Sequence, residues 1–209
     1  MTDRSVTKDR SRRPDDRPAE ILAAALDLFA ERGFTATRME DVASRAGLSK
    51  AAIYLYFRDK MALLEALVKQ TVLTNLGQAR TMAEAHDRQA GESLKAVMGF
   101  MAGRMTEGRL PDLIKLIISE SRAHPEIGRF YMENVINQGL PVFEALIRRG
   151  IERGEFRQVD PALTVRGMIA PMLFMAIWRT VFEPLGGEPL DIRAFVAHNQ
   201  DMLLRGLRP

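Results

Sequence analysis

Apolar residues spaced as on an α-helix recur through almost the whole of this 209-residue chain. From residue 18 onward they stand three and four positions apart, which places them on one face of a helix. Runs that alternate apolar and polar residues, as a half-buried strand requires, extend over no more than a few positions. The pattern therefore predicts an all-α protein of about nine helices.

Composition and helix breaks divide the chain into three predicted parts. Residues 1–17 carry six Arg or Lys and four Asp without apolar periodicity, which predicts a flexible basic tail, either solvated or touching DNA phosphates. Residues 18–60 predict a three-helix head, and residues 61–209 predict a larger helical domain. Pro141 and Pro171 fall inside helical patterns and are expected to kink or interrupt them. Helices beyond the head are expected near residues 60–86, 92–106, 111–122, 126–152, 161–183 and 190–206.

The head carries the start and stop signals of a helix-turn-helix. Pro18 suits the first turn of a helix and Gly33 suits its end. A Thr-x-x-Glu capping box at residues 37–40 opens a second helix. Gly47 ends that helix and Ser49 caps the third, so only a tight turn separates the two.

The third helix presents a face that suits the major groove of DNA. Because Ile53 points to the core, Lys50 and Tyr54 lie on or near the opposite face. The start of such a helix enters the groove, where Lys50 can donate to a guanine edge and Ala51 can meet a thymine methyl. The hydroxyls of Tyr54 and Tyr56 suit phosphate oxygens, with half-buried packing as the alternative for both. The candidate DNA-binding residues are Thr37, Arg38, Ser49, Lys50, Ala51, Tyr54, Tyr56 and Lys60.

Total charge is a weak guide to nucleic-acid binding in this chain. The 30 Lys and Arg exceed the 27 Asp and Glu by only three, and residues 1–60 hold 12 basic and 10 acidic residues. Any DNA contact must therefore depend on individual side chains. The Thr37 hydroxyl, at the start of the second helix, and the Lys60 ammonium, near the start of the fourth, are expected to reach phosphates.

The head resembles the DNA-binding domain of the TetR family of transcriptional regulators, from about residue 19 to residue 67. Ala52, Leu55 and Met61 depart from the residues that are frequent in the family, so the preferred base sequence does not follow from the resemblance. The residues that match the family pattern are Gly33, Phe34, Thr37, Ala43, Ala46, Gly47, Leu48, Ser49, Tyr54, Tyr56, Phe57 and Lys60.

The resemblance implies a one-component repressor that dimerises through its last two helices and binds a palindromic operator. It also implies that a small molecule in the C-terminal domain shifts the spacing of the two reading heads. The wide apolar faces of residues 161–183 and 190–206 suit a four-helix bundle between two copies; the alternative is that both faces pack within one subunit. A lone head offers few base contacts, which favours the homodimer.

An apolar ligand cavity is expected in the larger domain. Seven of the 12 methionines lie between residues 98 and 175, together with several aromatic residues. Flexible thioethers and rings suit an apolar or aromatic effector, although they also build ordinary cores. Glu120 stands beside Ile117 and Ile118 and is the best candidate for a polar group turned inward. The candidate ligand-binding residues are Phe100, Met101, Arg104, Met105, Ile117, Glu120, Phe130, Phe143, Met168, Met172, Met175 and Trp178.

Several classes of protein are disfavoured by what the sequence lacks. Without cysteine there are no disulfides, thiolate nucleophiles or cysteine zinc sites, and the three histidines have no zinc-type spacing. No hydrolase elbow, phosphate-binding glycine loop or dinucleotide fingerprint is present, so we expect no enzyme, cofactor or metal. The longest apolar run, residues 168–178, is too short to span a bilayer, and the N-terminus lacks a signal core, so a cytoplasmic protein is expected. The alternative function is a helical protein-interaction module. Weak salt dependence of binding would distinguish such a module from a DNA-binding protein.

Overall fold

The computed structural model describes residues 17–106 and 109–209, and within these ranges every regular element is a helix. This confirms the all-α prediction; the predicted tail lies outside the described residues except for its last position. The elements are α1 (Arg17–Ala36), α2 (Met39–Arg45), α3 (Lys50–Ile53), α4 (Lys60–Val68), η2 (Lys69–Leu73), α5 (Thr74–Ala83), α6 (Ala90–Thr106), α7 (Leu110–Glu120), α8 (Pro125–Tyr131), η3 (Met132–Ile136), α9 (Asn137–Glu152), α10 (Pro161–Ile177), η4 (Trp178–Phe182), η5 (Glu183–Leu185) and α11 (Ile192–Leu207).

The short segments η2, η3 and η4 are π-helical and continue the α-helices on either side of them. Thus α4 and α5 form one rod, α8 and α9 form another, and α10 continues through η4 into η5. With each joined rod counted once, the described residues contain nine helical rods, as the sequence predicted.

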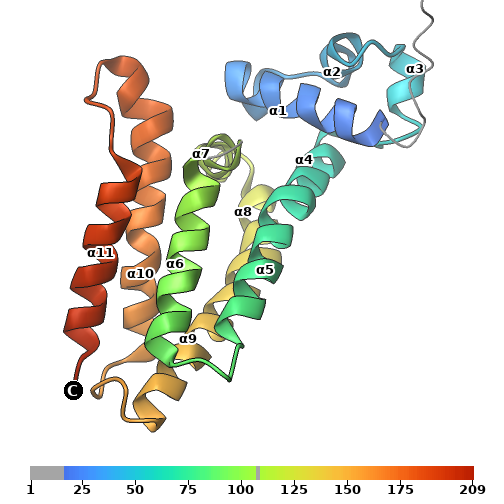
Figure 1. Ribbon diagram of the computed structural model, residues 1–209. Coiled ribbons are helices and arrows are strands. Elements are labelled where there is room, and N and C mark those ends of the chain that lie inside the picture. Colours follow the sequence, from blue (N-terminus) through green and yellow to red (C-terminus); the bar gives the residue numbers. More distant parts are fainter. Residues whose placement is uncertain (1–16, 107–108) are drawn as a thin grey trace, which may run out of the picture.

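A small head lies across one end of a larger helical bundle (Figure 1). The head contains α1, α2 and α3, and the rod of α4 and α5 leads from it down one side of the bundle. Helices α10 and α11 run antiparallel along the opposite edge, and the chain ends at the end of the bundle far from the head. Helix α7 lies beneath the head and contacts α1, α8 and α10, so it joins the two parts of the molecule.

The head is held together by a compact apolar core and by side chains that cap its helices. Ile21 and Ile53 are fully buried in this core. The Ser49 hydroxyl accepts from the Ala52 amide at 3.2 Å, as the sequence predicted, and the carboxylate of Asp59 accepts from the Ala62 amide at 2.8 Å. These contacts fix where α3 and α4 begin.

Two local predictions need correction. Helix α2 is capped at Arg38 rather than at Thr37, and the amide of Arg38 donates to the carboxylate of Asp41 at 3.2 Å. Helices α9 and α10 also continue through Pro141 and Pro171, so neither proline interrupts its helix, whereas a kink at either one stays a prediction. Pro141 has no N–H, so one backbone hydrogen bond of the helix is missing. This bond would lie at the junction of η3 and α9, which already departs from regular α-helical geometry.

Gly150, in α9, allows the buried ring of Phe156 to pack directly on the helix. A Cβ at this position would collide with Cδ2 of that ring. We expect G150A to lower the free energy of unfolding by about 1–3 kcal/mol, because the ring must move out of a close-packed site. Gly77, in α5, has open space around the same position, so G77A is the matched control and should be neutral or stabilising by up to ~1 kcal/mol. Urea denaturation of both variants measures the difference, and equal stabilities would contradict the packing described for Gly150.

Candidate DNA interface and ligand cavity

The head exposes one end of α3 and the turn that follows it. Ile53 is fully buried, whereas Tyr54 and Tyr56 are 44% and 41% exposed and Leu55 is 85% exposed. Both tyrosines are thus partly exposed, which fits a role at the groove rim and also fits the alternative of half-buried packing, so their contact with phosphates stays a prediction. Lys50 and Ala51 are also exposed, so the start of α3 is open to solvent as a groove-reading helix requires.

Lys50 forms an ion pair with Glu40 of α2, with 2.8 Å between Nζ and the carboxylate. The hydrogen bond from Lys50 lowers the pKa of Glu40, and the same contact raises the pKa of Lys50. Both side chains are largely exposed, so the ion pair can exchange for other partners. Lys50 is thus fully charged at neutral pH and is partly screened by Glu40.

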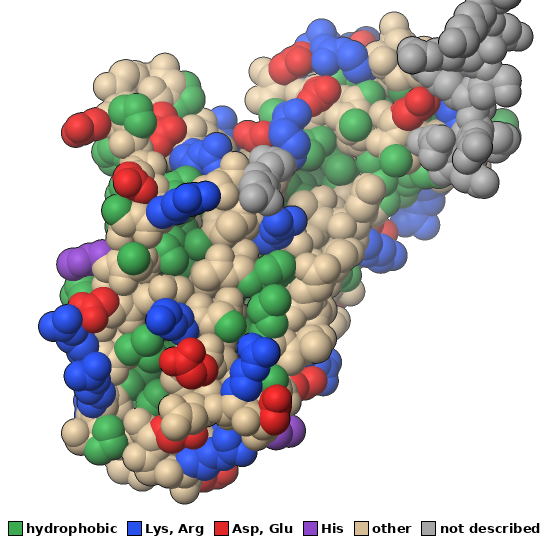
Figure 2. All heavy atoms as spheres, viewed as in Figure 1, with side chains coloured by type: hydrophobic (Ala, Val, Ile, Leu, Met, Phe, Trp, Pro, Cys, Tyr) green, Lys and Arg blue, Asp and Glu red, His purple; other side chains and the backbone are tan. Residues whose placement is uncertain are grey.

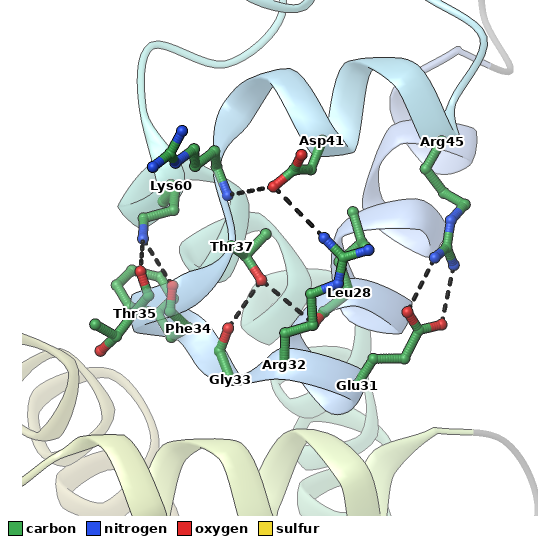
Figure 3. Close-up of polar contacts among 11 residues, drawn as sticks. Leu28, Glu31, Arg32, Gly33, Phe34, Thr35, Thr37, Asp41, Arg45 and Lys60 are labelled. Atoms are coloured by element: carbon green, nitrogen blue, oxygen red, sulfur yellow. Dashed lines mark hydrogen bonds and ion pairs between the residues drawn. The ribbon is translucent and has the colours of Figure 1, made fainter.

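Thr37 does not face solvent, contrary to the prediction that its hydroxyl reaches phosphate. Its side chain is fully buried, and the hydroxyl donates to the carbonyls of Gly33 at 2.8 Å and Leu28 at 3.3 Å (Figure 3). The physical reason is that the carbonyl of Gly33, where α1 departs from helical geometry, is open to the Thr37 hydroxyl. Thr37 therefore ties the α1–α2 connection to α1.

Lys60 also faces inward rather than toward a DNA backbone. Its Nζ donates to the carbonyls of Phe34 at 2.7 Å and Thr35 at 3.2 Å, and it lies 4.7 Å from the centroid of the Phe34 ring (Figure 3). Burial lowers the pKa of Lys60. The predicted phosphate contact is therefore not supported, because the ammonium clamps the start of α4 to the end of α1.

Charged pairs link α1 to α2 on the surface of the head. Arg45 donates twice to the carboxylate of Glu31, at 3.0 and 2.9 Å, and Arg32 lies 3.7 Å from Asp41 (Figure 3). Basic and acidic side chains alternate over the head on the face in view in Figure 2. The head thus has no large field of one sign on this face, in keeping with its small net charge.

Side chains at the C-terminal end of α7 form hydrogen bonds with the end of α1. The Glu120 carboxylate accepts from the Phe34 amide at 3.0 Å and from the Thr35 hydroxyl at 3.2 Å. Nε2 of His124 lies 2.9 Å from the same hydroxyl. Gly33 has φ +82°, and a Cβ there would lie 2.8 Å from Oε1 of Glu120. Glu120 was predicted to face the ligand cavity; it is instead the polar contact between bundle and head.

A second polar contact joins the start of α7 to the head. Arg109 forms an ion pair with Asp27 of α1, and its Nε donates to Asp112 at 2.7 Å. Helix α7 therefore contacts α1 through charged side chains near both of its ends. Neither partner could be found from the sequence, because Asp27 and Phe34 stand more than 80 positions away from the α7 residues that they meet.

A cavity of about 430 Å³ lies in the bundle between the η2–α5, α6, α7, η3–α9 and α10 segments. Its volume falls in the range of small-molecule sites. The residues that line it are Val72, Asn75, Leu76, Ala79, Phe100, Met101, Arg104, Met105, Leu110, Ile114, Tyr131, Val135, Ile136, Gly139, Leu140, Phe143, Arg166, Ile169, Ala170 and Leu173.

The cavity includes some of the predicted ligand-binding residues and omits others. Those that line it are Phe100, Met101, Arg104, Met105 and Phe143. Those that do not line it are Ile117, Glu120, Phe130, Met168, Met172, Met175 and Trp178. The three methionines of α10 are buried in the core instead, and the Trp178 indole donates to the carbonyl of Glu188 at 2.9 Å. Helical spacing in the sequence can identify residues that face inward. It cannot show which of the predicted ligand-binding residues border the cavity.

An apolar surface remains on the outer side of α10 and α11. The rod Pro161–Leu185 is long and apolar enough to span a membrane by length and composition alone, and within the described residues it packs on α6, α7 and α9. The centroid of the Phe174 ring lies 5.6 Å from the ring centroid of Trp178 and 5.8 Å from that of Phe195 in α11. The exposed large apolar residues of these segments, apart from Leu173 at the cavity, are Leu163, Phe174, Phe182, Leu185 and Met202.

Comparison with known proteins gives matches to both parts of the chain. Residues 21–67 match the family described as bacterial regulatory proteins, tetR family, and residues 89–188 match the tetracyclin repressor-like C-terminal domain. The uncharacterized HTH-type transcriptional regulator YfiR of Bacillus subtilis is 30% identical over 77% of this chain and 76% of its own length. RutR of Escherichia coli, an HTH-type transcriptional regulator, is 27% identical over 98% of this chain and 96% of its own length.

A solved structure agrees with these matches in fold and in sequence. A transcriptional regulator of the TetR/AcrR family from Thermobifida fusca superposes with a TM-score of 0.68 at 28% identity. The match covers 93% of this chain and all of the other one. The similarity therefore extends over the head and the bundle together.

Removing the Glu120 carboxylate should loosen the head from α7. We expect E120A to speed amide exchange at Phe34 by at least about tenfold and to lower the free energy of unfolding by about 1–3 kcal/mol, because a hydrogen bond to a charged acceptor is lost. Hydrogen–deuterium exchange of the α1 peptide and urea denaturation measure the two effects. Glu126, an exposed carboxylate beside His124, provides the control E126A. Unchanged protection of Phe34 in E120A would show that this contact does not hold the head.

Proposed function

We propose a function for this chain from the premise that it belongs to the TetR family of bacterial transcriptional regulators. It acts as a homodimeric repressor that binds a palindromic operator in the cytoplasm and is released by a small apolar or aromatic effector. The observation that carries the proposal is that the start of α3 is exposed, with Lys50 and Tyr54 on its surface. Two other predicted contact residues, Thr37 and Lys60, face the interior of the head.

DNA recognition centres on a few side chains. In the major groove Lys50 exchanges its contact with Glu40 for an acceptor on guanine, and the small side chain of Ala51 lets the helix approach the bases. The hydroxyls of Tyr54 and Tyr56 bind phosphates at the rim of the groove. Salt dependence follows from these phosphate contacts and is a direct sign of DNA binding.

Two heads are needed because one short recognition helix contacts few base pairs. The apolar surface of α10 and α11 supplies the means of joining two copies into a four-helix bundle, which has twofold symmetry and places the heads on adjacent half-sites. Half-sites one or more helical turns apart are the expected operator geometry.

Effector control operates through α7. One side of α7 borders the cavity through Leu110 and Ile114, and its ends hold α1 through Arg109 and Glu120. A ligand that prefers one position of α7 therefore also prefers one position of the head, which is the differential binding that allosteric control requires.

Lys50 and Tyr54 should be required for operator binding. An operator is first selected from random DNA, and binding is then measured by fluorescence anisotropy over a range of salt. We expect K50A and Y54A each to weaken binding by at least about tenfold, because each removes a base or phosphate contact. Lys95, exposed on α6 and far along the chain from the head, provides the charge-matched control K95A, which should bind normally. Selection that yields no inverted repeat, or binding that rises or stays constant with salt, would favour a protein-interaction module instead.

The outer surface of α10 and α11 should carry the dimer. We expect F174E to give a monomer by sedimentation velocity at micromolar concentration, because a carboxylate would be buried against apolar side chains. Ile118 on α7 is similarly exposed but lies outside this surface, so I118E is the matched control and should remain dimeric. A dimer that survives in F174E and dissociates in I118E would place the interface elsewhere.

A further inference from the structure

The ion pair between Glu40 and Lys50 differs in its setting from the ion pairs that join α1 to α2. The ion pairs of Glu31 and of Asp41 each connect a residue of α1 with a residue of α2. Glu40 instead connects the first turn of α2 with the first residue of α3, the helix that we propose to enter the major groove. The Glu40 carboxylate therefore lies beside the side chain that we assign to base recognition.

Stabilisation of the fold is a weak reason for this ion pair. The side chains of Glu40 and Lys50 are 43% and 70% exposed, and an exposed ion pair adds little stability because water already solvates both charges. Met39 and Val42, close to Glu40 in α2, are buried, so helical geometry leaves Glu40 on the open side of α2. Its carboxylate can therefore meet a partner outside the head once Lys50 moves away.

Binding of Lys50 to a guanine edge would leave the Glu40 carboxylate without its partner and close to DNA phosphates. Such a carboxylate is ionised at neutral pH, so it accepts hydrogen bonds and cannot donate one. Like charges brought together at an interface disfavour binding. The base-edge donors in the major groove are the exocyclic amino groups, cytosine N4 and adenine N6. Binding is therefore favoured where one of these amino groups meets Glu40.

The distance between the two charged groups limits which base pairs they can reach. Nζ of Lys50 lies 2.8 Å from the carboxylate of Glu40, which is less than the rise of about 3.4 Å between stacked base pairs. Within one G·C pair, the O6 acceptor of guanine lies next to the N4 donor of cytosine. Side chains that start this close together can therefore read one base pair or two neighbouring ones.

We propose that Glu40 is a specificity-determining residue of the DNA-binding surface, which accepts a hydrogen bond from cytosine N4 or adenine N6 at or next to the base pair that Lys50 contacts. This assignment rests on the proposed function and deepens it, because the operator half-site must then offer an amino group beside the acceptor that Lys50 binds. At other sequences the same carboxylate faces phosphates or the keto oxygens of guanine and thymine, so Glu40 weakens binding to unrelated DNA.

The test measures base preference position by position. Each base pair of the selected operator is replaced by the other three in both half-sites, and binding of the full-length protein is measured by fluorescence anisotropy at fixed salt. For the wild-type protein, we expect losses of at least about tenfold at the position that Glu40 reads. E40A should reduce the losses at that position to within about threefold, because the contact with the amino group is gone. K50A should relax the preference at the same position or at the next one.

Two further variants separate base reading from a structural role. E40Q keeps the size of the side chain, and we expect its preference to shift toward adenine, because Gln binds adenine through N6 and N7. A purely structural role of Glu40 would not produce this shift. E31A, which removes another exposed carboxylate of the head from its ion pair with Arg45, is the matched control and should keep every wild-type preference. Thermal unfolding of each variant without DNA verifies that it is folded.

The possible failures separate this assignment from the proposed function. Preferences that relax in K50A and stay unchanged in E40A would refute the role of Glu40 alone. A position relaxed in E40A that lies more than one base pair from the position relaxed in K50A would also refute it, as would the same relaxation in E31A. Failure to select any operator from random DNA would refute the proposed function and this assignment with it.

Discussion

The contact between the ends of α1 and α7 sets how the head sits on the bundle. The Phe34 amide points at the carboxylate of Glu120, and the backbone at Gly33 adopts φ +82° beside it. A side chain at Gly33 would be strained in this conformation and would also displace the carboxylate. The Lys60 ammonium holds the next carbonyls from the other side, so the end of α1 lies between α4 and α7. The orientation of α3 depends on this junction, because α3 is packed on α2 and α2 on α1.

Helix α7 connects two parts of the molecule that differ in chemistry. Its cavity side is apolar and its head side is charged, so one short helix borders the apolar cavity and also holds the head by polar contacts. Polar contacts at a helix end depend strongly on distance and angle, whereas apolar packing tolerates small shifts. A small displacement of α7 would therefore disturb Glu120 and Arg109 before it opened the core.

Much of the head follows from local sequence. Ser49 and Asp59 cap helices because their side chains reach amides only a few positions away, and α3 exposes Lys50 and Tyr54 because Ile53 must be buried. Thr37 shows the limit of local reasoning. A Thr-x-x-Glu pattern is compatible with a capping box, but carbonyls of α1 offered its hydroxyl a buried alternative, and the cap moved to Arg38.

The amino-acid sequence by itself determined the helices, most of their ends, the family resemblance and the exposed face of the third helix, because each depends on residues within one or two helical turns. Only the tertiary structure decided that Glu120 binds the head rather than a ligand, that Lys60 clamps α1, and that Tyr131 and Arg166 border the cavity in place of Met172 and Trp178. The physical reason is that helical periodicity fixes which face of a helix is apolar. Which neighbour covers that face, and where the cover leaves a void, depends on how helices far apart in the chain pack together.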